Sequence, residues 1–255
     1  MSAKDTPTKY RAPALDKGLD ILELLATQPT GMSRAEIVKA LERGASEIYR
    51  MLERLVARGY VGRSFEGDRY ALTIKLFQLG AMYPPLRRLV AQAQPFMDFF
   101  AQETGQSLHL VTPDLGQSFV VAQATGASPW EFRLRLGAEL DLFTTGSGQT
   151  LLAFMTENQV THTLQMRGAA SQQLPSELET DLIEIRNAGH RVAPSQQLIG
   201  VTDLSVPVST TGKDVVGVLT CPFLPRVVDD GRDVSDQIET CLKKLTDTAQ
   251  KISLS

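Results

Sequence analysis

Apolar and polar residues between Ser33 and Leu72 follow two helical repeats and then an alternating, strand-like pattern. Ser33 is followed three residues later by Glu36, a spacing typical of a capping box, so we expect a helix to begin there. Its buried side is expected to consist of Ala35, Ile37, Val38 and Leu41. A tight turn at residues 43–45 follows, in which Gly44 would supply the left-handed backbone conformation that such turns often need.

A second amphipathic helix is predicted at residues 46–58, with its apolar residues at core spacing: Ile48, Met51, Leu52, Leu55 and Val56. Its other face is polar: Ser46, Glu47, Tyr49, Arg50, Glu53 and Arg54. Ser46, Arg50 and Arg54 are four residues apart and therefore form one row. One hydroxyl and two guanidinium groups on an exposed row suit phosphate oxygens and base edges.

A hairpin is predicted after Gly59, which ends this helix. Residues 60–64 and 69–73 alternate like strands, and residues 66–68 supply the turn. Arg63 and Arg69 would then be placed to reach a backbone phosphate. Helix, turn, helix and hairpin within about 40 residues predict a winged helix-turn-helix that binds double-stranded DNA. The alternatives are an arginine row that is merely solvated and a winged domain that contacts protein.

The segments around this domain are expected to connect it to partners and to the rest of the chain. Residues 1–12 are predicted to be a disordered tail, 13–72 the DNA-binding domain and 73–90 a linker region. A helix is predicted at 73–82, and a second at 86–104 continues beyond the linker; Pro84 and Pro85 separate the two. The helix predicted at residues 16–28 carries two apolar stripes: Leu15, Leu19, Leu22 and Ala26, and Ile21, Leu24 and Leu25. They indicate either one wide core face or a surface for a partner.

The rest of the chain, residues 91–255, has the mixed pattern of an α+β domain. Strands are predicted at 107–112, 118–123, 130–136, 190–194, 204–208 and 215–221, and helices at 148–155, 177–188 and 235–252. The stretch from Thr144 to Gly148 precedes a helix, where backbone N–H groups favour an anion such as a carboxylate. An ordinary capped helix start is the alternative.

The composition shows an uneven distribution of charge along the chain and argues against several classes of protein. Residues up to Pro85 hold 13 basic and 10 acidic side chains, a net +3, whereas the remainder carries −6. This excess lies in the predicted DNA-binding half. Two cysteines in apolar segments, Cys221 and Cys241, argue against a disulfide framework and for a cytoplasmic protein. No signal peptide, membrane span, catalytic motif or metal-ligand spacing is recognised in the sequence, so we expect no membrane association, enzyme activity, cofactor or metal.

The chain resembles the IclR family of bacterial transcriptional regulators in the order of its motifs. Residues 14–25 look like the family's opening helix, 46–52 and 55–61 like its recognition helix and wing entry, and 69–80 like its second wing strand and linker. Arg135-Leu136-Gly137, residues 142–154, Ile185-Arg186 with Gly189, and Gly200-Val201 with Asp203 and Pro207 are similar to its effector-domain signature.

The resemblance implies a GAF/PAS-like effector domain, a homodimer or tetramer, and two sets of binding residues. The DNA-binding set is Ser33, Arg34, Ala45, Ser46, Glu47, Tyr49, Arg50, Arg54, Arg63 and Arg69, and the effector-binding set is Gly146, Ser147, Val201, Asp203 and Thr220. Glu47 departs from the family's basic helix start, and it would either read a cytosine or reject some sites. Asp203 replaces a small residue or Cys.

Together these features predict a ligand-responsive regulator of catabolic genes. Its effector would be a small carboxylic acid, aromatic or hydroxylated, because Asp203 would repel a bare carboxylate but accept hydrogen bonds from a hydroxyl or amine. The competing interpretation is an enzyme domain, a small-molecule hydrolase or isomerase, fused to a DNA-binding module. The absence of a catalytic constellation from the sequence counts against it.

Overall fold

The computed structural model describes residues 12–64, 68–126, 132–167, 174–209, 214–226 and 233–254. The chain divides into two compact units, Met1–Pro84 and Pro85–Ser255, and each has a hydrophobic core. The predicted tail, apart from residue 12, and most of the predicted wing turn lie outside the described residues. No helix in the described ranges is long and apolar enough to cross a membrane.

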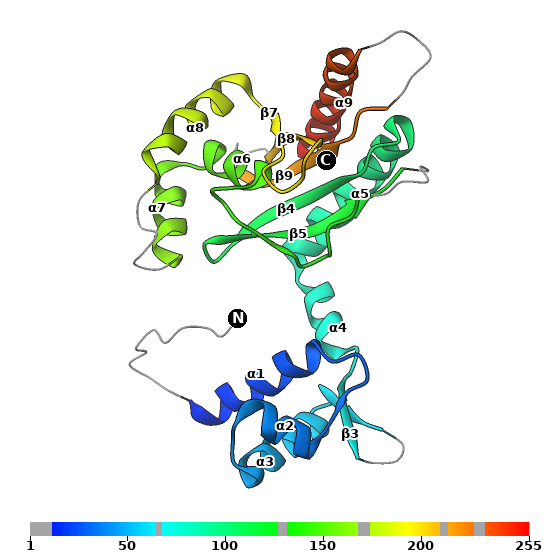
Figure 1. Cartoon of the computed structure of the whole chain (residues 1–255), viewed down its shortest axis with the longest axis vertical. Coiled ribbons are helices and arrows are strands. Elements are labelled where there is room, and N and C mark those ends of the chain that lie inside the picture. The colour runs from blue at the N-terminus through cyan, green and yellow to red at the C-terminus, as the bar shows by residue number, and fades with distance from the viewer. Residues whose placement is uncertain are drawn as a thin grey trace. The chain divides into compact units, whose positions relative to one another are not determined.

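The first unit is a winged helix-turn-helix (Figure 1). It contains α1 (Pro13–Ala26), α2 (Arg34–Leu41), α3 (Ala45–Ala57) and α4 (Lys75–Met82). An antiparallel sheet of order β1-β3-β2 joins β1 (Met32–Ser33), β2 (Val61–Arg63) and β3 (Arg69–Leu72). Its core is formed by Ile21, Leu25, Ile37, Ile48, Leu52, Val61 and Tyr70. The predicted order of helix, turn, helix and hairpin is therefore confirmed.

The residues that cap α2 and α3 explain why these helices begin where they do. Ser33 and Glu36 form the predicted capping box, in which the Ser33 N–H donates to Glu36 Oε2 at 2.7 Å and Ser33 Oγ accepts from the Glu36 N–H at 3.3 Å. The prediction of a left-handed Gly44 is wrong, because Glu42 adopts that conformation (φ 51°) and Gly44 is the extended N-cap of α3. Ala35 is exposed rather than buried, since α2 buries only the side that contains Ile37.

Two apolar elements of this unit remain exposed. On α1, Ile21 and Leu25 lie in the core, whereas Leu15 and Leu19 are 61% and 46% exposed. On α4, Phe77 is 71% exposed, together with Leu76, Leu79 and Met82. The helix α4 begins at Lys75, whose N–H donates to Thr73 Oγ1 at 3.2 Å. The apolar stripes of α1 are thus not one wide core face.

The second unit is built on a six-stranded antiparallel sheet of order β6-β5-β4-β9-β8-β7 (Figure 1). Its strands are β4 (Leu108–Asp114), β5 (Gln117–Ala124), β6 (Glu139–Leu140), β7 (Arg191–Pro194), β8 (Thr202–Ser209) and β9 (Val215–Phe223). The helices are α5 (Pro84–Thr104), α6 (Gly146–Phe154), α7 (Glu157–Met166), α8 (Ser176–Ala188) and α9 (Val234–Leu254). α5 and α9 share one hydrophobic core with the sheet, and α6 and α8 share the other. This arrangement agrees with the predicted α+β effector domain.

Three predictions for the second unit need correction. No strand occurs at residues 132–136, and the strand that pairs with β5 is β6, at Glu139–Leu140; residues 130 and 131 lie outside the described ranges. The helix α7 was not predicted, although Thr156 and Gln159 form a capping box before it. Pro84 and Pro85 begin α5 rather than standing apart from it, because proline is tolerated in the first turn of a helix.

Candidate DNA-binding helix and candidate effector site

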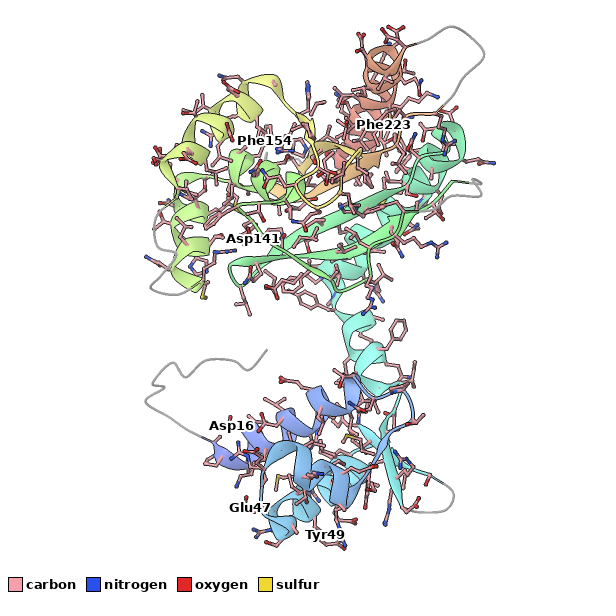
Figure 2. The ribbon with its side chains drawn as sticks, viewed as in Figure 1. Asp16, Glu47, Tyr49, Asp141, Phe154 and Phe223 are labelled. Carbon is pink, nitrogen blue, oxygen red and sulfur yellow. The ribbon has the colours of Figure 1, made fainter. Side chains whose placement is uncertain are left out.

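The outward side of α3 carries the predicted arginine row. Ser46, Arg50 and Arg54 are all exposed, and neither guanidinium forms a hydrogen bond or ion pair with another described residue. Tyr49 lies on the same exposed side and is directed away from the core of its unit (Figure 2). The guanidinium of Arg34 stacks over the Tyr49 ring at 5.4 Å, so α2 and α3 share one polar and aromatic surface. Ala45 is also exposed, at the first position of α3.

Glu47 is held by a cation of the same unit. Its Oε1 lies 2.9 Å from Lys17 Nζ of α1, and this ion pair lowers the pKa of the Glu47 carboxyl. The carboxylate that departs from the family's basic helix start is therefore partly neutralised within the unit. This contact connects α1 with the first turn of α3, and it leaves the arginine row as the main positive feature of that helix.

Other predicted DNA contacts have structural roles in this unit. The hydroxyl and the N–H of Ser33 are both used in the capping box. Arg69 Nη2 donates to the Gly31 carbonyl at 2.8 Å and lies 3.4 Å from Glu36 Oε2. Arg63 lies 3.8 Å from Glu53 and stacks over Tyr70. The guanidinium of Arg69 thus ties the wing to the loop before α2, and a phosphate contact from it remains a prediction.

A row of polar side chains crosses the sheet of the second unit at one level. In the strand register Arg191 of β7 pairs with Ser205 of β8, Ser205 pairs with Thr220 of β9, and Thr220 pairs with His109 of β4. Paired residues point to the same face of a sheet, so these four side chains share a face. Ser205, Thr220 and His109 are buried. We refer to these four residues as the polar row.

The beginning of α6 lies directly over the polar row. Ser147 Oγ hydrogen-bonds Thr220 Oγ1 at 2.8 Å and is 3.4 Å from His109 Nε2, and Ser205 Oγ lies 2.9 Å from Thr220 Oγ1. A Cβ built on Gly146 would lie 3.1 Å from Ser205 Oγ. The structure thus brings the predicted residues Gly146, Ser147 and Thr220 together.

Some backbone donors at this helix start have no acceptor among the residues that the structure describes. The Thr145 side chain accepts from the Gly148 N–H, but the N–H groups of Gly146 and Ser147 donate to no described residue. Both residues are buried. A buried helix N-terminus with unused donors and a partial positive charge is suited to an anion.

Asp203 and Arg191 bring opposite charges to the outer end of the row. Burial raises the pKa of the Asp203 carboxyl, while a hydrogen bond from Ser195 and the charge of Arg191 oppose the shift. Burial also lowers the pKa of the Arg191 guanidinium, against the effect of Asp203. The Asp203 Cβ lies 3.2 Å from a Cβ built on Gly146, and Val201 is buried nearby in sequence.

His109 ends the buried side of the row as a neutral imidazole. Full burial lowers its pKa to about 4, because a charged ring loses its hydration there. Sequence reasoning missed His109, Ser205, Gln149 and Arg191, which come from four elements and meet only through strand register and helix packing. A polar residue in each of three apolar strands, β4, β8 and β9, was the available signal.

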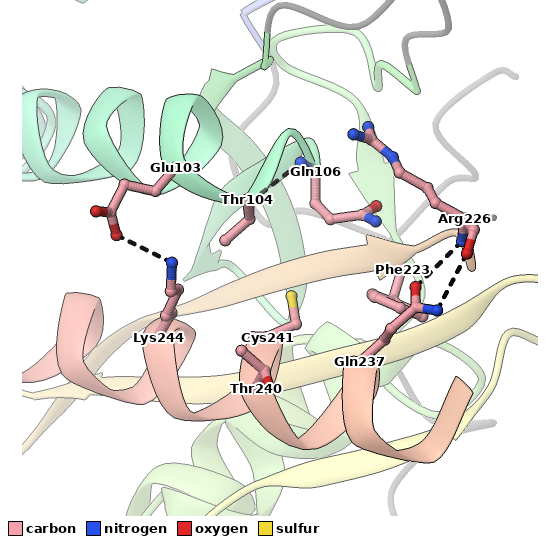
Figure 3. A pocket seen from close by; sticks show the side chains of 9 residues that line it. All are labelled: Glu103, Thr104, Gln106, Phe223, Arg226, Gln237, Thr240, Cys241 and Lys244. Carbon is pink, nitrogen blue, oxygen red and sulfur yellow. Dashed lines mark hydrogen bonds and ion pairs between the residues drawn. The ribbon is translucent and has the colours of Figure 1, made fainter. Parts of the chain in front are cut away.

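A separate pocket of about 190 Å³ opens elsewhere in this unit, between α5, the end of β9 and α9 (Figure 3). Gln106, Arg226 and Gln237 line it, but their polar groups bond to one another or to nearby carbonyls. Cys241 also lines it, and its Sγ lies 3.9 Å from that of Cys221; both thiols are free. The described residues contain no group of three potential metal ligands.

Comparison with known proteins assigns both units. Residues 14–64 match the model of the IclR helix-turn-helix domain, and residues 86–254 match that of the bacterial transcriptional regulator IclR C-terminal domain. The transcriptional repressor IclR of Escherichia coli K12 is 21% identical over 232 residues, covering 88% of this chain and 85% of the relative. The regulator XynR of the same strain is 24% identical over 222 residues, covering 85% and 88%.

Solved structures share the fold. IclR of Thermotoga maritima is 24% identical, with a TM-score of 0.72, covering 94% of this chain and 97% of that one. An IclR homologue from Microbacterium hydrocarbonoxydans, complexed with 4-hydroxybenzoate, is 20% identical with a TM-score of 0.75, covering 94% and 98%. The relatives are named as regulators or repressors and not as enzymes. With its winged helix-turn-helix and its C-terminal effector domain, this chain belongs to the IclR family of bacterial transcriptional regulators.

Proposed function

We propose that this regulator responds to a small carboxylic acid that binds where α6 begins. The observation that supports this most directly is the pair of N–H groups on Gly146 and Ser147, which are buried and donate to no described residue. Two N–H groups at a helix N-terminus match the two oxygens of a carboxylate. Asp203 and the hydroxyl of Thr220 offer partners for a second polar group, and Val201 offers apolar contact.

The chemistry of one structural relative agrees with this class of ligand. The homologue from Microbacterium hydrocarbonoxydans was solved with 4-hydroxybenzoate, an acid that carries a hydroxyl group at the other end of its ring. We propose an aromatic or hydroxylated acid for this chain as well, because Asp203 accepts a hydrogen bond from a hydroxyl or amine but repels a second carboxylate. We also propose that such an effector controls catabolic genes, and that the protein acts in the cytoplasm.

We further propose that the row Ser46, Arg50 and Arg54 contacts double-stranded promoter DNA, with Tyr49 and Arg34 beside it. A homodimer, or a tetramer of two dimers, would present two such helices to a pseudo-palindromic site. Exposed Leu15 and Leu19 on α1 support a self-contact of this unit.

The test of the effector site compares two glycines of α6. Gly146→Ala places a methyl group 3.1–3.3 Å from Ser205, Asp203 and Arg191, where side chains can shift slightly, so the fold should survive while the carboxylate is displaced. Gly148→Ala would instead place Cβ 2.5 Å from the backbone of Asp141 and Leu142, and should destabilise the unit. Calorimetry with a panel of aliphatic and aromatic acids should show binding to wild type and loss of it in Gly146→Ala. Unchanged binding in Gly146→Ala would place the acid elsewhere.

A further inference from the structure

Arg191 is a charged group of the effector region with a hydrogen-bond donor that is not used. Its Nε donates to Gln149 Oε1 at 2.7 Å, which fixes the guanidinium under α6. Its Nη1 is buried and donates to no described group. An unused buried donor on a partly buried charged group is costly, since the desolvation of that donor is not offset by a hydrogen bond.

The unused nitrogen of Arg191 lies close to the start of α6. Nη1 lies 3.3 Å from a Cβ built on Gly146, the first residue of α6. A cation beside a helix N-terminus is repelled by the partial positive charge of that end of the helix. The guanidinium and the unused N–H groups of Gly146 and Ser147 therefore lie together at the start of α6, and no described carboxylate accepts a hydrogen bond from them.

Asp203 does not fill that role in this structure, because no ion pair within 4.0 Å joins it to Arg191. Asp203 therefore acts on Arg191 only through its longer-range field. The region around the first residue of α6 therefore holds one cation, two amide donors and one carboxylate acceptor.

We propose that Arg191 is the cationic anchor of the effector carboxylate, and that the Arg191–Asp203 arrangement selects monocarboxylates that carry a hydrogen-bond donor. This inference rests on the proposed effector site and names its ligand class more narrowly. The guanidinium donates through Nη1 to one carboxylate oxygen, and the α6 amides donate to the other. Asp203 accepts from the ligand's hydroxyl or amine, so a dicarboxylate, with a second anion facing Asp203, binds more weakly.

The test uses the full-length protein and pairs of acids and amides: acetate with acetamide, lactate with lactamide, and 4-hydroxybenzoate with 4-hydroxybenzamide, plus succinate as a dicarboxylate. Thermal unfolding and calorimetry are measured for wild type, Arg191→Gln, Arg191→Lys and the control Arg87→Gln, which removes an exposed charge from α5. We expect a hydroxy acid to bind wild type and its amide not to bind. Arg191→Gln should weaken the acid about 10- to 100-fold, the size of a lost charge-assisted hydrogen bond.

The other variants separate charge from geometry. Arg191→Lys keeps the charge but not the planar fork and should bind with intermediate affinity, while Arg87→Gln should match wild type. Asp203→Asn should reduce the preference for hydroxy acids over succinate. An acid that binds wild type and Arg191→Gln equally, yet is lost in Gly146→Ala, would overturn the role of Arg191 while the proposed site stands. An amide as effective as its acid would also overturn it. If no acid binds wild type, both proposals fail.

Discussion

Arg50 is the side chain on which we expect DNA affinity to depend most. It is exposed at the centre of the α3 row, and its guanidinium makes no hydrogen bond or ion pair with a described residue. Arg50→Ala should therefore leave the thermal unfolding midpoint unchanged and cost about 1–3 kcal/mol of specific binding. Ser46→Ala should cost less, because a hydroxyl makes fewer and weaker contacts. Fluorescence anisotropy with promoter DNA measures both, and unchanged affinity in Arg50→Ala would remove Arg50 from the interface.

His109 gives the effector domain a dependence on pH. Its pKa falls to about 4 in the folded state, below the ordinary value of 6.5, so the unfolded chain binds the additional proton between these values. Stability contributed by neutral His109 is complete above about pH 6.5 and is lost as the pH falls toward 4, by at most about 3 kcal/mol. His109→Gln should flatten this part of the curve relative to wild type. Urea unfolding from pH 7 to pH 4 tests it, and parallel curves would contradict the assignment.

Arg69, in the wing strand β3, stabilises the fold of the first unit. Arg69 of β3 donates to the Gly31 carbonyl and approaches Glu36. We expect Arg69→Met to lower the free energy of unfolding by about 0.5–1.5 kcal/mol, the usual value of a partly exposed hydrogen bond. If Arg69 instead contacts a phosphate, Arg69→Met should reduce the slope of log K against log salt concentration for DNA binding by about one. Arg58→Met, at an exposed position after α3, is the control for loss of charge, and salt titrations decide between the two roles.

Local patterns predicted α2, α3 and the wing strands to within one or two residues. The signals for them, the capping box at Ser33 and the apolar repeat of α3, are formed by residues that are close together in the sequence. No strand occurs at 132–136, the described part of the strand expected at 130–136: apolar and charged residues alternate there as in a strand, but β5 pairs with a short segment further along the chain. The polar row could not be predicted, since Arg191 and His109 are 82 residues apart and meet only through the pairing of four strands. Sequence indicated the helix start at Gly146, but not the cation beside it.

The exposed apolar side chains of the first unit favour assembly of the regulator into a dimer. Leu15 and Leu19 of α1 and Phe77 of α4 expose apolar side chains, while the core of this unit is complete without them. Single exposed leucines are ordinary, but several on two helices of so small a domain fit a self-contact. A dimer would also offset the modest +3 charge of this half, because two units double the number of phosphates contacted.

Replacing Leu15 and Leu19 together by serine should weaken this dimer without loss of helical content, since neither side chain lies in the core. Leu115→Ser, at an exposed turn of the effector domain, is the matched control. Sedimentation velocity at micromolar concentration should show wild type and control as dimers or tetramers, and the double variant as a smaller species. The salt slope of its DNA binding should also fall to about half, because the slope follows the number of phosphates neutralised. A wild-type monomer, with and without DNA, would contradict the dimer.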